Sequence, residues 1–271
     1  MQKFVAKEQG KITKILSGKI SYGVVMSALK KKDVKVNGKR VNKDLTVNVA
    51  DVIEIYYTQK PTTPKYEKVF EDDNLLVVDK DGGITSEELF DILKEEYPTL
   101  RFIHRLDRNT TGIIIFAKNE VSENQLLFGF KNRAFEKKYR ARVFGKPKKQ
   151  NETLTAYLFK DAKKSQVFVY DSERKLTVKI ITEYTFIKDY GDGTSLLEVN
   201  LITGKTHQIR AHLAFVDLPI VGDGKYGKNA VNDKYKVNRQ QLTASSLTLK
   251  FDKDSPLYYA NGKTFYAKER F

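Results

Sequence analysis

Runs of β-branched and aromatic residues, many of them alternating with polar ones, predict a chain rich in strands. The unbroken apolar run 113–117 follows Gly112 and predicts a buried strand. Between residues 154 and 200 the pattern predicts long antiparallel strands at 166–170, 176–186 and 195–202, with a turn at 191–193. Shorter strands at 68–71 and 75–78 are expected to pair across residues 72–74.

One further strand has an apolar face and a basic face. Three apolar residues alternate there with three basic ones: Tyr139, Ala141 and Val143 against Lys138, Arg140 and Arg142. Successive side chains of a strand point to opposite faces, so Tyr139 is expected on the inward face. On the pattern alone, Tyr139 is a phenol buried against the core.

Helices are predicted where an apolar stripe follows a capping residue. Thr85 and Glu88 form a capping box for a helix that carries three apolar residues, Leu89, Ile92 and Leu93. Ser122 and Gln125 are expected to cap a second helix, which reaches about Asn132.

Thr206 is expected to cap a third helix. Its buried stripe consists of Ile209, Leu213 and Val216. Arg210 lies on the flank of this stripe, where its guanidinium can turn toward a site.

The N-terminal residues predict a small α/β unit at 1–58. A helix over 21–32 ends in Lys30, Lys31 and Lys32, and strands around Asn37-Gly38 form a hairpin whose far side carries Lys39 and Arg40. Residues 59–65 contain two prolines and no apolar periodicity, so they are interpreted as a linker to a larger domain at 66–271. These basic residues are either a binding face or ordinary solvated surface.

Composition narrows the class of partner. Lys and Arg number 49 against 34 Asp and Glu, a formal net charge of +15 over 271 residues, which favours a polyanion unless the charge is merely solubilising. No apolar run approaches the roughly 20 residues of a spanning helix, and the first residues lack a secretory signal. We therefore expect a cytoplasmic protein without a membrane anchor. The absence of cysteine excludes disulfides and thiolate chemistry.

The candidate site is the polar segment 101–112, which precedes the strand at 113–117. It contains Asp107, one imidazole and three guanidiniums, and neighbouring cations favour an ionised carboxylate that acts as a nucleophile or charge stabiliser. The alternative is an ion-pair cluster that closes a turn. All three histidines, His104, His207 and His212, fall in this segment or at 203–214, but no acidic pair flanks them and the i, i+5 spacing does not suit zinc, so no metal is predicted.

Three motifs carry a resemblance to a known family. They are His104-Arg105-Leu106-Asp107 with Asn109-Thr110-Thr111-Gly112, the strand 138–143, and the run 201–214 that continues into 219–223 and Tyr226-Gly227. In this order they resemble the RluA-type RNA pseudouridine synthases, and residues 1–58 are similar to an S4 RNA-binding domain. Two positions depart from the family, which usually has a proline where Asp81 stands and a histidine where Thr243 stands.

The resemblance implies a function and a fold. The fold would be α+β, a largely antiparallel mixed sheet with a central cleft, preceded by the S4-like α/β domain. The activity would be isomerisation of uridine in structured RNA, with ribosomal RNA favoured over transfer RNA, by a monomer without a cofactor. Asp107 would be the catalytic carboxylate, Tyr139 a base or stacking partner, and Arg210 the partner of Asp107. The RNA-binding residues would be His104, Arg105, Lys138, Lys205, Lys30, Lys31, Lys32, Lys39 and Arg40. The alternative is a non-catalytic RNA-binding or ribosome-assembly protein.

Overall fold

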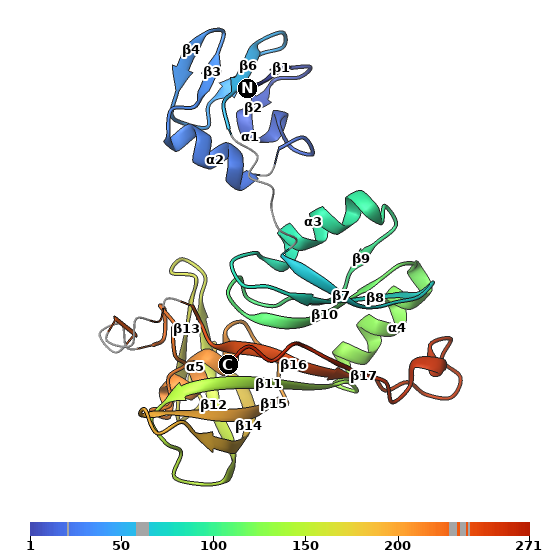
Figure 1. Cartoon of the computed structure of the whole chain (residues 1–271), viewed down its shortest axis with the longest axis vertical. Coiled ribbons are helices and arrows are strands. Elements are labelled where there is room, and N and C mark those ends of the chain that lie inside the picture. Colours follow the sequence, from blue (N-terminus) through green and yellow to red (C-terminus); the bar gives the residue numbers. More distant parts are fainter. Residues whose placement is uncertain (21, 58–64, 228–231, 234–236, 238) are drawn as a thin grey trace. The chain divides into compact units, whose positions relative to one another are not determined.

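A computed structural model describes residues 1–20, 22–57, 65–227, 232–233, 237 and 239–271. The chain divides into two compact units, Met1–Thr63 and Pro64–Phe271 (Figure 1). The predicted linker 59–65 lies, apart from Lys65, outside the described residues. None of the described helices combines the length and the apolar character needed to cross a membrane.

The first unit packs two short helices against small sheets. Its main sheet has the order β1-β6-β3-β4, and β2 pairs with β5. The elements are β1 Gln2–Val5, β2 Gly10–Lys11, α1 Ile12–Ile15, α2 Tyr22–Lys30, β3 Val34–Val36, β4 Lys39–Val41, β5 Thr46–Val47 and β6 Val52–Ile55. The predicted hairpin is confirmed: Asn37 and Gly38 both have positive φ, 50° and 78°, as a type I′ turn requires.

The second unit is built on one eleven-stranded sheet. Its order is β13-β12-β14-β15-β11-β16-β10-β8-β7, with β17 on β16 and β9 on β10. Every pair is antiparallel in the described residues except β10 with β16, which is parallel. The strands are β7 Tyr66–Glu71, β8 Leu75–Lys80, β9 Arg101–Phe102, β10 Thr111–Ala117, β11 Glu136–Phe144, β12 Asn151–Asp161, β13 Gln166–Tyr170, β14 Val178–Asp189, β15 Thr194–Leu201, β16 Leu242–Thr248 and β17 Thr264–Tyr266.

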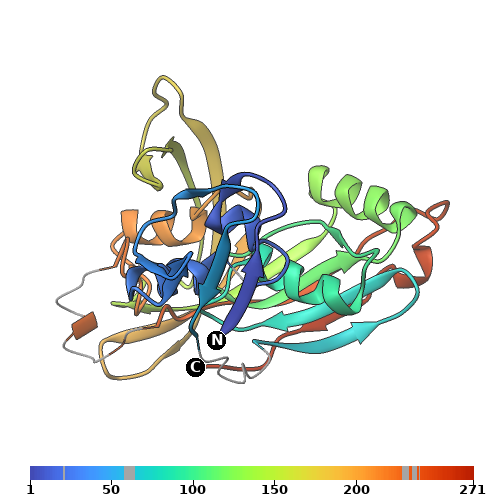
Figure 2. The same ribbon diagram turned by 90° about the horizontal axis from the view of Figure 1, so that it is seen from above.

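Helices cover both faces of this sheet. They are α3 Ser86–Glu96, α4 Glu120–Lys131, α5 Gln208–Phe215 and the 3-10 turn η1 Tyr258–Ala260. In β10, Ile114 and Phe116 pack toward α3, whereas Ile113 and Ile115 pack toward α4, so the continuous apolar run reflects burial on both sides. Figure 2 shows the hairpin of β12 and β13 projecting from the rest of the sheet.

Two of the three predicted helix caps are wrong, and the predicted start of the helix over 21–32 lies outside the described residues. The capping box of Thr85 and Glu88 is confirmed, although Ile92 on that helix is exposed. The cap of α4 is Asn119, and Ser122 is the third residue of the helix, returning a hydrogen bond to the cap. Asparagine is as good an N-cap as serine, and the helix begins after Asn119 because the turn that follows it is acidic, which suits a helix N-terminus.

The third start is displaced by one residue and has a different cause. No side chain caps α5: His207 precedes it in the left-handed region, with φ of 54°. The side chain of Gln208 folds back instead and accepts from the Lys205 backbone N–H at 3.1 Å. The stripe of Ile209 and Leu213 is buried as expected.

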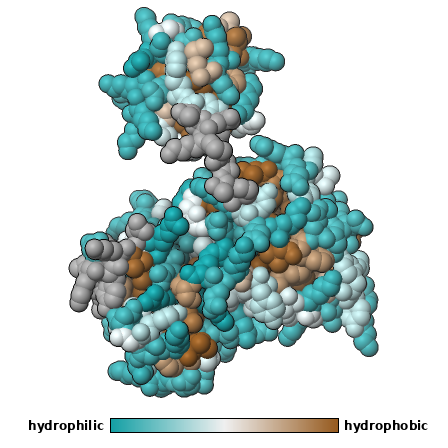
Figure 3. Space-filling model, viewed as in Figure 1, coloured by the Kyte–Doolittle hydropathy of each residue, from teal (hydrophilic) through white to brown (hydrophobic). Residues whose placement is uncertain are grey.

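The apolar and basic faces of β11 are also confirmed. Ala141 and Val143 are fully buried and pack against α5 residues, with Tyr139 beside them. The basic side chains therefore lie on the other face of the sheet. On the side shown in Figure 3, hydrophilic residues cover most of the visible surface of each unit.

Candidate active site

A cavity of about 510 Å³ in the second unit brings the three motifs together. Asp107, Tyr139, Lys205, His207 and Arg210 all line it. They come from the loop before β10, from β11, from the segment between β15 and α5, and from α5 itself. The described residues contain no group of three or more His, Cys, Asp or Glu side chains that could hold a metal ion.

Hydrogen bonds from buried side chains fix the loop that carries Asp107. The Lys80 ammonium, fully buried, donates to the carbonyls of Ile84 at 2.8 Å, Asp81 at 2.9 Å and Arg108 at 3.2 Å. Burial lowers the pKa of Lys80 to about 8, and the charge of Asp107 opposes this shift. Ser86 holds the backbone of Leu106 by accepting from its N–H and donating to its carbonyl. These hydrogen bonds hold the Asp81-Gly82-Gly83 turn against the loop that carries Asp107.

Gly112 ends the same loop at a close approach of two backbones. Its φ is +110°, and a Cβ there would lie 2.2 Å from the carbonyl oxygen of Ala244 in β16. Only glycine fits such a contact in this region of φ. Thr111 beside it shares a hydroxyl hydrogen bond of 2.7 Å with Thr243, the residue at the family's usual histidine position.

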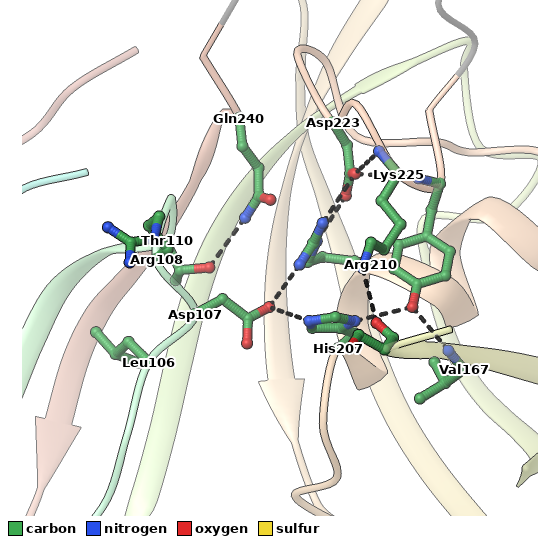
Figure 4. A network of polar contacts seen from close by, with 12 residues as sticks. Leu106, Asp107, Arg108, Thr110, Val167, His207, Arg210, Asp223, Lys225 and Gln240 are labelled. Atoms are coloured by element: carbon green, nitrogen blue, oxygen red, sulfur yellow. Dashed lines mark hydrogen bonds and ion pairs between the residues drawn. The ribbon is translucent and has the colours of Figure 1, made fainter. Parts of the chain in front are cut away.

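Arg210 lies between two carboxylates (Figure 4). Its Nη1 donates to Oδ2 of Asp107 at 2.8 Å, and its Nε and Nη2 donate to Asp223 at 2.7 and 3.0 Å. Although burial alone would raise the pKa of Asp223, the hydrogen bonds and charge of Arg210 and two backbone N–H groups hold it below its usual value. Sequence reasoning predicted the Asp107 partner and missed Asp223, although the segment 219–223 was part of the resemblance.

Asp107 uses only one of its oxygens in these contacts. In the described part of the chain, the polar contacts of its side chain are all made by Oδ2, to Arg210 at 2.8 Å and to His207 Nε2 at 3.8 Å. Figure 4 shows the other oxygen turned away from both. The carboxylate is therefore anchored at one oxygen and available at the other.

Tyr139 lines the same cavity as Asp107 and packs against the hydrophobic cluster that contains Leu106 and Ala244. Burial raises the pKa of its phenol, and the charge of Asp107 raises it further. The hydroxyl therefore stays protonated at neutral pH.

The three guanidiniums of the Asp107 segment do not surround that carboxylate, contrary to prediction. Each is paired with a glutamate of a neighbouring helix: Arg105 with Glu87 at 2.8 Å, Arg108 with Glu88 at 3.0 Å and Arg101 with Glu123 at 2.8 Å. Asp107 owes its cationic partner to α5, more than a hundred residues away, and local sequence does not reveal such a contact.

His104 lines the cavity but has a structural partner as well. Its Nε2 accepts the backbone N–H of Ile115 at 3.1 Å, and its ring stacks on Phe130 with centroids 4.5 Å apart. Burial lowers its pKa to about 3, so the ring is neutral.

Lys138 is separated from this cavity. It lies on the opposite face of β11, 3.1 Å from Glu198, and lines a second cavity of about 500 Å³. Three cations that sequence reasoning did not select line the first cavity instead: Lys131, Arg133 and Lys137. The run of basic residues at 131–138 is the feature of the sequence that could have indicated them. In the first unit, Lys30, Lys31, Lys32, Lys39 and Arg40 are all exposed.

Comparisons with known proteins agree with this geometry. A family model described as RNA pseudouridylate synthase matches residues 30–215. Ribosomal large subunit pseudouridine synthase C of Rickettsia bellii is 30% identical over 262 residues, 85% of this chain and 84% of that protein. The dual-specificity RNA pseudouridine synthase RluA of Vibrio parahaemolyticus is 32% identical over 212 residues, 69% of this chain and 79% of that protein.

A solved structure shares the fold. Human RNA pseudouridylate synthase domain containing 1 superposes with a TM-score of 0.64 at 24% identity, over 72% of this chain and 83% of that one. The eleven-stranded sheet is thus a pseudouridine synthase fold. The chain belongs to the RNA pseudouridylate synthase family, in its RluA-type branch, and is an RNA pseudouridine synthase.

Proposed function

We propose that the chain isomerises uridines of structured RNA, ribosomal RNA in the first place, with Asp107 as the catalytic carboxylate. The observation that carries this proposal is the one-sided anchoring of Asp107, which lines the cavity: Arg210 holds Oδ2, whereas Oδ1 has no polar contact with any described residue. Breaking the C1′–N1 bond leaves electron deficiency at C1′, which Oδ1 can meet by adding covalently or by stabilising charge. Joining C5 to C1′ and releasing the C5 proton completes an isomerisation.

The neighbouring groups have complementary roles in this proposal. Arg210 orients Asp107 by donating a charge-assisted hydrogen bond to its Oδ2. Tyr139, with its raised pKa, offers a neutral aromatic face to the base. A stacking role suits this environment better than that of a general base.

Cations on the cavity rim support binding of the RNA backbone. Lys131, Arg133, Lys137 and Lys205 make no ion pair with any carboxylate of the described residues. Burial lowers the pKa of Lys137, and the charge of Arg133 lowers it further, so like charges crowd one side of the cavity. Phosphates would relieve this repulsion and hold an extruded uridine in place.

Release of tritium from RNA containing 5-tritiated uridine tests the proposal. Wild-type protein is expected to release it and Asp107→Asn to release none while still binding RNA. The matched control is Asp91→Asn on the exposed surface of α3, which should behave as wild type. Full release by folded Asp107→Asn overturns the assignment, and no release by the wild type on any RNA supports the non-catalytic RNA-binding or assembly protein.

For the first unit we propose an S4-like RNA-binding domain at 1–58, linked through 59–65 to a catalytic domain at 66–271. Its support is the exposed basic group at the end of α2 and on β4, of which no member forms an ion pair with a described residue. Replacing Lys30, Lys31 and Lys32 by Gln should flatten the salt dependence of RNA binding by about 0.7 in log–log slope per lost contact. Lys175, Lys250 and Lys253 replaced together are the control, and an equal effect of both triples contradicts the proposal.

Ribosomal RNA is favoured because several relatives are named as synthases of the large ribosomal subunit. We expect a monomer that acts in the cytoplasm, where that RNA is found. Mapping pseudouridine in total RNA from cells with and without the gene identifies the target, and a lost site in transfer RNA alone would contradict the ribosomal assignment.

A further inference from the structure

His207 has both ring nitrogens in defined places. Its Nδ1 lies 2.8 Å from the hydroxyl of Tyr226, and its Nε2 lies 3.8 Å from Oδ2 of Asp107. The Tyr226 hydroxyl also accepts the backbone N–H of Val167 in β13 at 2.9 Å. Figure 4 shows this chain of contacts running from Val167 to Asp107.

The Val167 contact decides which nitrogen of His207 carries the proton. A backbone N–H can only donate, so the phenolic oxygen is already an acceptor there. Its single proton then has the Nδ1 lone pair as its acceptor, which places the imidazole proton on Nε2. The opposite tautomer would direct two donors at one phenolic oxygen and leave the phenolic proton without an acceptor among the described residues.

We infer that Tyr226 holds His207 as the Nε2–H tautomer, so that His207 presents a neutral N–H donor to the same oxygen of Asp107 that Arg210 binds. His207 and Tyr226 are thereby positioning residues of Asp107, and this inference rests on the proposed function. The resting separation of 3.8 Å exceeds a hydrogen bond by about 1 Å, and such contacts shorten when substrate fills a site. With two donors on Oδ2, the free pair of Oδ1 is directed at the sugar.

The charges around His207 are consistent with a neutral ring. Burial lowers its pKa most; the charges of Arg210 and Lys225 lower it as well, while those of Asp107 and Asp223 raise it. Protonation would also place a second hydrogen between Nδ1 and Tyr226, displacing the hydrogen bond that orients the ring. The left-handed backbone of His207 and its place before α5 hold the ring between both partners.

Nitrogen-15 NMR of histidine-labelled protein measures the tautomer directly. The chain has three histidines, and the signal missing from His207→Gln identifies His207. We expect it as Nε2–H at pH 7.5, whereas His104, whose Nε2 accepts from Ile115, is expected as Nδ1–H in the same spectrum. In Tyr226→Phe the His207 signal should move toward a mixture of tautomers. An Nδ1–H or mixed His207 in the wild type overturns the inference.

Kinetics of tritium release test the consequence for Asp107. Tyr226→Phe and His207→Leu are expected to lower kcat by about tenfold or more with little change in KM, since one charge-assisted hydrogen bond is lost. His207→Gln retains an N–H donor at nearly the same reach and should recover part of kcat over His207→Leu. The control Tyr259→Phe removes a hydroxyl bound to Asp72, outside the cavity lining, and should change neither kcat nor the spectrum.

The outcomes separate this inference from the proposed function. Equal kcat for His207→Leu and wild type, or for His207→Leu and His207→Gln, overturns the positioning role even if Asp107 is catalytic. Full activity of Asp107→Asn refutes the proposed function and leaves the tautomer measurement to be judged on the spectrum alone.

Discussion

The two carboxylates that share Arg210 should respond in opposite ways when each is replaced by its amide. The Asp223 side chain is 0% exposed and accepts two hydrogen bonds from Arg210 and others from the backbone N–H groups of Lys225 and Tyr226. The Asp107 side chain is 21% exposed and, among the described residues, accepts a hydrogen bond from Arg210 alone. Asp223 is therefore built into the fold, whereas Asp107 is attached to it at one point.

These contacts determine how much stability each substitution is expected to cost. Breaking a buried ion pair costs about 3–5 kcal/mol, and we take the lower end for Asp223→Asn because Arg210 keeps Asp107. Asp107→Asn leaves the bidentate pair intact, so we expect about 1 kcal/mol or less, after allowing for its contact with solvent. At about 3 °C per kcal/mol for a unit of this size, Tm should fall by about 10 °C for Asp223→Asn and about 3 °C for Asp107→Asn.

Thermal unfolding and tritium release on the same preparations compare the two variants. Asp107→Asn should be well folded and inactive, and Asp223→Asn less stable yet partly active per folded molecule, because Arg210 still reaches Asp107. Asp91→Asn again serves as the control for amide substitution. A large drop in Tm for Asp107→Asn with normal activity of the folded fraction would show that Asp107 is a structural ion-pair partner and that this reasoning is wrong.

Three further expectations follow from single contacts. Gly112→Ala should lower the free energy of unfolding by about 3 kcal/mol or more, since its Cβ would overlap β16; an unchanged urea midpoint contradicts this. Burial lowers the pKa of His212 to about 4, from an ordinary 6.5. As pH falls through 6.5, His212 therefore binds a proton in the unfolded chain before it does so in the folded one, and the free energy of unfolding declines from there toward pH 4, by about 2 kcal/mol at pH 5. His212→Gln should reduce this decline, as measured by urea titrations at pH 7 and pH 5. Arg210→Lys should reduce product yield, and combined with Asp107→Asn it should be no worse than Asp107→Asn alone.

Sequence patterns correctly predicted those elements that are determined by residues close together in the chain. The Asn37-Gly38 hairpin, the Thr85 capping box and the two faces of β11 each depend on residues a few positions apart, and all are confirmed. The start of α5 was missed because His207 takes a left-handed backbone conformation, which is uncommon for a residue other than glycine. Tertiary contacts hold it there.

The residues of the site and the Asp107–Arg210 pair were predicted, whereas its other contacts were missed. The resemblance to the synthase family indicated Asp107, Tyr139 and Arg210, and all three line one cavity. Sequence did not show that Lys80 is buried beneath the Asp107 loop or that Lys138 is paired with Glu198 on the opposite face. Lys80 contacts Arg108, which is 28 residues away in the sequence, and the Lys138–Glu198 pair depends on which strand lies beside β11. Hydrophobic periodicity carries no information on such contacts.

The parallel pairing of β10 with β16 has a consequence for how the protein is made. Asp107 precedes β10, whereas Tyr139 lies on β11, and β16 stands between these two strands in the sheet. During synthesis, residues 66–117 and 136–215 are made before β16, so β10 and β11 cannot yet pair with the strand that lies between them. Domains generally fold as units, and pairing between strands far apart in the sequence is slow. The cavity can therefore close only after residue 248 has been added, and a nascent chain lacking β16 carries every proposed catalytic residue without a site.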